Sequence, residues 1–104
     1  MLASLTCSEL FSQVLLIEDD PGHARLVQRA LRETLADLEV VSTLGEARVK
    51  VQEQYFELII SDLNLPDAHG LEIIQVVRAL RPSVPLLVLT SENDLDFAVQ
   101  AMRE

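Results

Sequence analysis

The stretch Leu-Ile-Ile-Ser-Asp (58–62) decides the fold, because an unbroken apolar run ends there in a carboxylate. An earlier run, Val-Leu-Leu-Ile (14–17), ends in the same way, in Glu-Asp-Asp (18–20). Continuous apolar runs of this length are typical of strands that are buried on both faces of a parallel sheet. Ligands bind beyond the carboxyl ends of such strands, so we expect these acids to converge on one site.

The chemistry of crowded carboxylates indicates what this site holds. Like charges raise one another's pKa unless a cation relieves the repulsion. A site that offers a few hard oxygen ligands suits Mg²⁺, which keeps several water molecules and also binds phosphate oxygens. The sequence therefore predicts a magnesium pocket at the carboxyl edge of the sheet.

The bulk composition narrows the class of protein. The chain has 104 residues, of which 49% are hydrophobic, and this predicts a single folded domain. Its net charge of -9 argues against binding to nucleic acid or to an anionic membrane surface. Cys7 is the one cysteine, so no intrachain disulfide can form, and no apolar run approaches the ~18 residues of a membrane span. We expect a cytoplasmic domain.

Apolar runs alternate with helical periodicity along the chain, which is typical of βαβ units. The predicted strands are 14–17, 39–43, 58–61 and 85–89, and the predicted helices are 22–35, 44–54, 71–80 and a last one capped by Asn93 or Asp94. The strand 39–43 is less apolar than the others, so we expect it at a sheet edge. Short right-handed crossovers then give a parallel sheet with helices on both faces.

Periodicity also predicts the buried side of each helix. The first helix is expected to follow an Asp20 N-cap, with Pro21 at its first position. The expected buried residues are Leu26, Val27, Ala30 and Leu31 in the first helix, Ala47 and Val51 in the second, and Ile74, Val77 and Leu80 in the third.

With these elements in place, the sequence resembles the receiver domain of two-component response regulators. The segments that carry the resemblance are Val-Leu-Leu-Ile-Glu-Asp-Asp-Pro (14–21), Ile-Ile-Ser-Asp-Leu-Asn-Leu-Pro-Asp-Ala-His-Gly (59–70) and Pro-Leu-Leu-Val-Leu-Thr-Ser (85–91). The resemblance covers 14–104 and leaves 1–13 as an N-terminal extension. It implies a flavodoxin-like (CheY-like) doubly wound parallel sheet of strand order 2-1-3-4, in which the fifth strand and fifth helix are missing.

The resemblance also implies roles for particular residues. Asp62 would be the phosphoacceptor, taking a phosphoryl group from a sensor histidine kinase or a phosphotransfer protein. Mg²⁺ would be bound by Asp19 and Asp62, by Glu18 through water and by the backbone carbonyl of Asn64. Thr90 would donate a hydrogen bond to the phosphoryl group and pass the signal on. Such a domain is not an enzyme, beyond magnesium-dependent self-phosphorylation from small phosphodonors and autodephosphorylation.

The chain departs from the family pattern after the fourth strand. The family places a phosphoryl-contacting lysine on its fifth strand, whereas the only lysine here, Lys50, falls on the second predicted helix. The fourth strand would also be left as an exposed apolar edge, which favours pairing with another chain. A longer gene product, coverage by the leading segment, or a homodimer through this edge would each resolve the exposure, and we expect the homodimer.

The sequence leaves other functions open. A receiver fold that serves as a phosphorylation-independent interaction or dimerisation module is the main alternative. A phosphatase resembling the haloacid dehalogenase family needs a second aspartate where Asn64 stands, and the three glycines form no phosphate loop. Taken alone, Asp19 or Asp20 would be a helix cap, and His23 and His69 are expected to face solvent.

Overall fold

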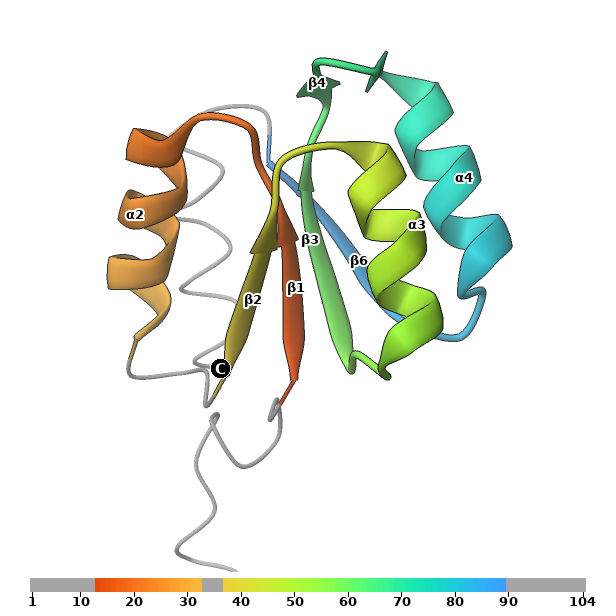
Figure 1. Ribbon diagram of the computed structural model, residues 1–104, viewed down its shortest axis with the longest axis horizontal. Coiled ribbons are helices and arrows are strands. Elements are labelled where there is room, and N and C mark those ends of the chain that lie inside the picture. Colours follow the sequence, from red (N-terminus) through yellow and green to blue (C-terminus); the bar gives the residue numbers. More distant parts are fainter. Residues whose placement is uncertain (1–12, 33–36, 90–104) are drawn as a thin grey trace, which may run out of the picture.

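A four-stranded parallel sheet forms the centre of the protein, with helices on both faces (Figure 1). The computed structural model describes residues 13–32 and 37–89. Its elements are β1 (Val14–Ile17), α2 (Pro21–Leu31), β2 (Leu38–Val41), α3 (Leu44–Glu53), β3 (Leu58–Asp62), β4 (Asn64–Leu65), β5 (Ala68–His69), α4 (Leu71–Leu80) and β6 (Leu86–Leu89). The sheet order is β2-β1-β3-β6, which confirms the predicted order 2-1-3-4 because β6 is its fourth strand.

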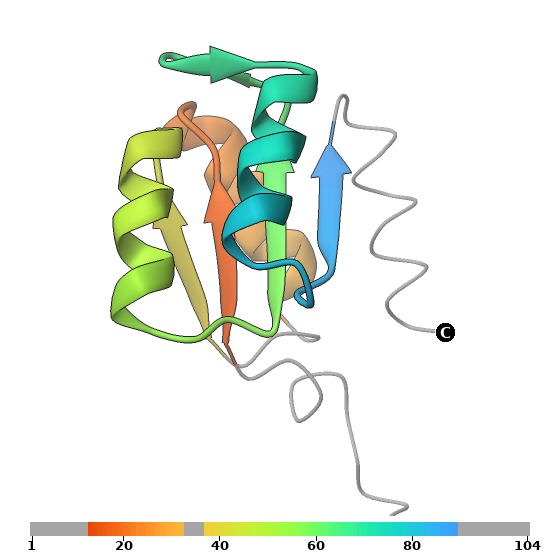
Figure 2. The same cartoon turned by 90° about the vertical axis from the view of Figure 1, so that its right-hand side faces the viewer.

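The alternation of side chains along the strands builds two separate cores. Leu15, Ile17 and Ile59 face α3 and α4, where they pack with residues such as Ala47, Val51, Ile73 and Val77. Val14, Leu16, Leu58 and Ile60 face the opposite side and pack against Ala24, Val27 and Leu31 of α2. Figure 1 shows the sheet between these two helix layers, and Figure 2 shows it face-on, with α3 and α4 in front and α2 behind. This arrangement confirms the predicted parallel sheet with helices on both faces, and with it the doubly wound fold that the resemblance implies.

Helix α2 begins as the sequence predicts but buries a different set of residues. Asp20 is the N-cap, with its carboxylate accepting the N–H groups of Gly22 and His23, and Pro21 is the first helical residue. The prediction that Leu26 is buried is wrong, since 43% of it is exposed. Ala24, three residues before Val27, occupies the buried face instead, because that face follows the spacing of Ala24, Val27 and Leu31. The predicted extension to residue 35 lies outside the described residues.

The two helices on the other face follow the predictions with one correction. Helix α3 buries Ala47 and Val51, as expected, together with Leu44. In α4 the fully buried isoleucine is Ile73, not Ile74. Ile73 and Val77 lie one turn apart, so they point to the same side of the helix, and Ile74 is rotated toward its flank.

A small hairpin interrupts the segment that the sequence predicts as a loop between β3 and α4. Strands β4 and β5 pair antiparallel around Pro66 and Asp67, which suit the central positions of a type I turn. Leu65 and Ala68 are buried on the α3–α4 side, and they anchor the hairpin to the core. Gly70 ends it with φ 66° and ψ -139°, a conformation that is essentially reserved for glycine.

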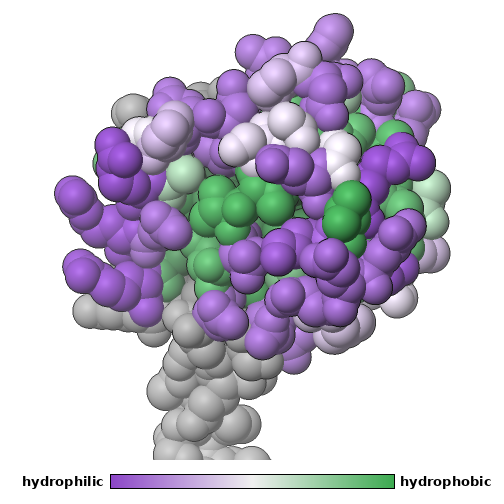
Figure 3. Space-filling model, viewed as in Figure 1, coloured by the Kyte–Doolittle hydropathy of each residue, from purple (hydrophilic) through white to green (hydrophobic). Residues whose placement is uncertain are grey.

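Strands β2 and β6 form the two edges of the described sheet, so the expected edge position of β2 is confirmed. Figure 3 views the molecule from the β2 edge and shows apolar surface there among hydrophilic side chains. A shallow groove beside β2 and α3 includes Val40, Val41 and the exposed Val49.

The homodimer through the β6 edge stays a prediction, and the predicted last helix lies outside the described residues. Within the described ranges, no helix has the length and apolar character needed to cross a bilayer.

Candidate functional site

The register of the sheet brings two carboxylates from distant parts of the sequence together. Ile17 pairs with Ser61 in the parallel ladder between β1 and β3, so Glu18 and Asp62 are the next residues along each strand. Both fall on the side of the sheet that faces α2, because side chains alternate and Leu16 and Ile60 face that helix. The unbroken apolar runs therefore deliver both acids to the same edge and the same face.

Glu18 is an acid buried at the end of β1, with 3% of its surface exposed. Its backbone N–H donates to the carbonyl of Val41 at 2.9 Å, which fixes the residue at the strand end. Burial raises the pKa of Glu18 above its usual 4.5, and the Asp62 charge raises it further, while hydrogen bonds from Asp20 N–H and the His23 ring act in the opposite direction. A bound cation would stabilise the charged form of this group.

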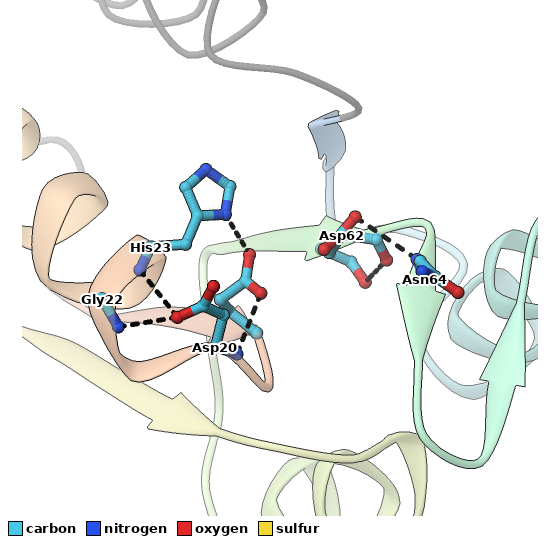
Figure 4. A network of polar contacts seen from close by, with 7 residues as sticks. Asp20, Gly22, His23, Asp62 and Asn64 are labelled. Carbon is cyan, nitrogen blue, oxygen red and sulfur yellow. Dashed lines mark hydrogen bonds and ion pairs between the residues drawn. The ribbon is translucent and has the colours of Figure 1, made fainter.

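His23 corrects the sequence analysis, which expected it to face solvent. Its ring turns toward the acids, and the contact from Nδ1 to Glu18 Oε1 is 2.5 Å (Figure 4). The side chain of His23 is 21% exposed and that of Glu18 is 2% exposed. The signal available in the sequence was the cap at Asp20, because it places His23 in the first turn of α2, where the helix meets the end of β1. His69 is exposed, as expected.

Asp62 lies at the end of β3, partly buried and held by its own neighbours. Its Oδ1 accepts the backbone N–H of Asn64 at 3.3 Å, and its carbonyl accepts the Ser61 hydroxyl at 2.8 Å (Figure 4). Asn64 itself is exposed at the start of β4. The contact from Asn64 orients the Asp62 side chain, the contact from Ser61 holds its backbone, and a carboxylate oxygen still lies within 4.8 Å of ligand atoms of Glu18 and His23.

The remaining predicted residues lie apart from this group or outside the described residues. Asp19 is exposed, and together with Glu18 it lines a shallow depression at the start of α2. Thr90 lies outside the described residues, directly after Leu89, which pairs with Asp62 in the ladder between β3 and β6. Lys50 lies on α3, as the sequence predicts, and its ammonium group is 3.6 Å from Glu39 and 3.9 Å from Glu53.

The donors at this edge suit a divalent cation. Ligand atoms of Glu18, His23 and Asp62 all lie within 4.8 Å of one another. Donors that share one Mg²⁺ stand about 2.1 Å from it, so opposite donors are about 4.2 Å apart. The group therefore needs only small side-chain movements to close around an ion. Asp19 is not in this group, and it would have to turn inward to become a ligand.

Comparisons with known proteins agree with this geometry. The family model for the response regulator receiver domain matches residues 14–104. The transcriptional regulatory protein ZraR of Escherichia coli (strain K12) is 27% identical over 90 residues, which are 86% of this chain and 20% of ZraR. The regulatory protein LuxO of Vibrio vulnificus (strain YJ016) is 33% identical over 88 residues, which are 85% of this chain and 19% of LuxO.

Solved structures give the same result. The chemotaxis response regulator CheY4 of Vibrio cholerae has a TM-score of 0.66 at 28% identity, and the match covers 85% of this chain and 79% of that one. The chain spans about a fifth of the length of the curated relatives named above. The likeness to those relatives thus concerns one of their domains.

Proposed function

Because this chain belongs to the family of response regulator receiver domains of two-component systems, we propose that Asp62 is its phosphoacceptor. The observation that carries the proposal is the approach of Asp62 to the buried Glu18 at the carboxyl edge of the sheet. A phosphoryl group there would add negative charge to a site that already holds two carboxylates. Such a reaction requires a cation, and the same carboxylates supply its ligands.

In the proposed reaction, a carboxylate oxygen of Asp62 attacks the phosphorus of a phosphohistidine on a sensor kinase or phosphotransfer protein. The new O–P bond gives an acyl phosphate, while the P–N bond breaks and the released imidazole takes up a proton. The receiver contributes mainly positioning and charge neutralisation. The contact from Asn64 N–H holds the attacking carboxylate, and the buried end of β3 holds its backbone.

Mg²⁺ is the proposed cofactor. Asp19 and Asp62 would bind it directly, Glu18 through water, and Asn64 through its backbone carbonyl; Thr90 would donate its hydroxyl to a phosphoryl oxygen. The ion would neutralise phosphoryl oxygens during transfer. The intrinsic chemistry would be limited to self-phosphorylation from small phosphodonors and autodephosphorylation, in a domain that works in the cytoplasm.

Incubation of the chain with acetyl phosphate and Mg²⁺, followed by intact-mass spectrometry, tests the proposal. We expect the mass of one phosphoryl group to be added. The gain should disappear in Asp62→Ala and when the ion is chelated. Asp37→Asn is the matched control, because Asp37 is an exposed acid before β2 and should leave the gain unchanged.

The same experiment separates the phosphoacceptor from a phosphorylation-independent interaction module. If no mass is gained with a small phosphodonor, and none is gained with a panel of phosphorylated histidine kinases, the interaction module is the better description. A mass gain that persists in Asp62→Ala would instead mean that another residue is the phosphoacceptor.

A further inference from the structure

His23 gives this pocket a nitrogen donor beside its oxygens. We infer that the pocket accepts a divalent transition ion such as Mn²⁺, bound by His23 together with Glu18 and Asp62. The inference rests on the proposed function in one respect, because it uses the same carboxylate pocket. It does not require phosphotransfer, and it concerns a residue to which the resemblance gives no role.

The position of His23 is fixed by local structure. Asp20 accepts the N–H of His23 at 3.3 Å, so the first turn of α2 holds the residue at the end of β1. From there the ring reaches Glu18, with Nδ1 at 2.5 Å from Oε1. Its side chain keeps 21% of its surface exposed, which leaves the ring room to swing outward as an ion enters.

The contact between the ring and Glu18 marks a place where a cation is favoured. In the tautomer that donates to an ionised Glu18, a proton lies between Nδ1 and Oε1. A metal ion that replaces this proton would have one nitrogen and one oxygen ligand already side by side. Asp62 adds a second oxygen, since the three ligand atoms all lie within 4.8 Å of one another.

This donor set changes which ions the pocket prefers. Carboxylate and water ligands alone suit Mg²⁺ and Mn²⁺, whereas an imidazole nitrogen increases affinity for transition ions over Mg²⁺. Mg²⁺ also demands near-ideal octahedral geometry and gives up its water reluctantly. A mixed nitrogen and oxygen pocket should therefore bind Mn²⁺ more tightly than Mg²⁺, and the difference should depend on His23.

Pulsed electron paramagnetic resonance with Mn²⁺ alone tests the inference on the full chain. We expect a ¹⁴N coupling from one imidazole in the wild-type protein. It should disappear in His23→Asn and remain in His69→Asn, a matched control because His69 is exposed on β5. His23→Asn should also lower the affinity for Mn²⁺ about tenfold or more, and the affinity for Mg²⁺ less.

A measurement on the wild-type chain keeps the inference testable if His23→Asn fails to fold. With ¹⁵N-labelled histidine, Mn²⁺ should broaden the ring signals of His23 at lower ion concentrations than those of His69. The inference is overturned if Mn²⁺ binds with no nitrogen coupling, if the coupling comes from His69, or if no Mn²⁺ binds.

Failure of the proposed function would give a different result. A mass gain at Asp62 with Mg²⁺ but no nitrogen coupling would support the proposal that Asp62 is the phosphoacceptor and contradict only the inferred role of His23. Nitrogen coupling without any mass gain from phosphodonors or kinases would contradict the proposal that Asp62 is a phosphoacceptor, and the inferred metal pocket would stand.

Discussion

Asp67 and Leu44 are joined by a hydrogen bond of 2.9 Å across the surface of the protein, although 23 residues separate them in the sequence. Oδ1 of Asp67 accepts the N–H of Leu44, and Oδ2 accepts the N–H of Gly45, also at 2.9 Å. One carboxylate thus caps two free N–H groups in the first turn of α3. It also ties the hairpin that follows Asp62 to that helix.

We predict that Asp67→Asn lowers the stability of the protein at neutral pH. Hydrogen bonds from two backbone N–H groups lower the pKa of Asp67 below its usual 3.8, and the bond from Leu44 has a larger effect than the bond from Gly45. A depressed folded-state pKa contributes stability that is fully present above the unfolded value and is lost as pH falls through the folded value. Urea denaturation should therefore show a deficit in the variant at pH 7 that shrinks below about pH 4.

Glu72→Gln is the control for Asp67, because Glu72 is an exposed acid in the first turn of α4. It should show a much smaller deficit at neutral pH. A deficit in Asp67→Asn that stays constant from pH 7 to pH 3 would contradict the charge-based explanation.

Gly70 and Gly45 should respond in opposite ways to the same substitution. Gly70 has φ 66° and ψ -139°, so Gly70→Ala should cost about 1 to 3 kcal/mol. Gly45 is helical, and an added Cβ would lie 3.5 Å from Asp67 Oδ2, an ordinary contact. Gly45→Ala should leave stability unchanged or raise it by up to about 1 kcal/mol. Equal free energies of unfolding for the two variants would contradict this reading of Gly70.

The sequence was most informative where burial is enforced on both sides of an element. The run Leu58–Asp62 is apolar up to its terminal acid, so a strand buried on both faces and the sheet edge at which the acid lies were both predictable. The buried face of each helix was harder to predict, because apolar residues are adjacent in the sequences of α2 and α4. Leu26 beside Val27, and Ile74 beside Ile73, leave the rotation of each helix to be decided by packing against the sheet.

The candidate site was predictable for the acids and not for the residues around them. Glu18 and Asp62 follow from parallel strands that end at one edge. The cap at Asp20 placed His23 in the first turn of α2, but its contact with Glu18 also depends on the angle at which the helix leaves that cap. Asp67 was also missed, since its partners are backbone N–H groups 22 and 23 residues away, which no pattern of side chains records.

The rotation of α4 can be tested by comparing its two adjacent isoleucines. Ile73 is fully buried among residues of the α3–α4 core, and Ile74 is partly exposed. Ile73→Ala should lower the free energy of unfolding by about 2 to 5 kcal/mol, because it removes buried methyl groups and leaves a cavity. Ile74→Ala should cost no more than about 1 kcal/mol. Urea denaturation of both variants measures the difference, and a larger loss at Ile74 would mean that the helix is rotated.

Asp19 and Asp20 are adjacent acids that should have separable roles. Oδ1 of Asp20 is already used by the N–H groups of Gly22 and His23, at 2.9 and 3.3 Å, so Asp20 caps α2. Asp20→Ala should therefore lower the free energy of unfolding by about 1 kcal/mol, and Asp20→Asn, which keeps the acceptor, by less. Neither change removes a proposed magnesium ligand.

Asp19→Asn should have the reverse effect. Asp19 is exposed beside Glu18 at the start of α2, so the substitution should leave the unfolding transition nearly unchanged. It should weaken Mg²⁺ binding about tenfold or more, because it removes a proposed direct ligand from a site that has few. Titration with Mg²⁺ followed by NMR shifts of the β1 and β3 amides measures this. Weaker binding in Asp20→Asn than in Asp19→Asn would exchange the two roles, and the cap at the start of α2 would then have to open when the ion binds.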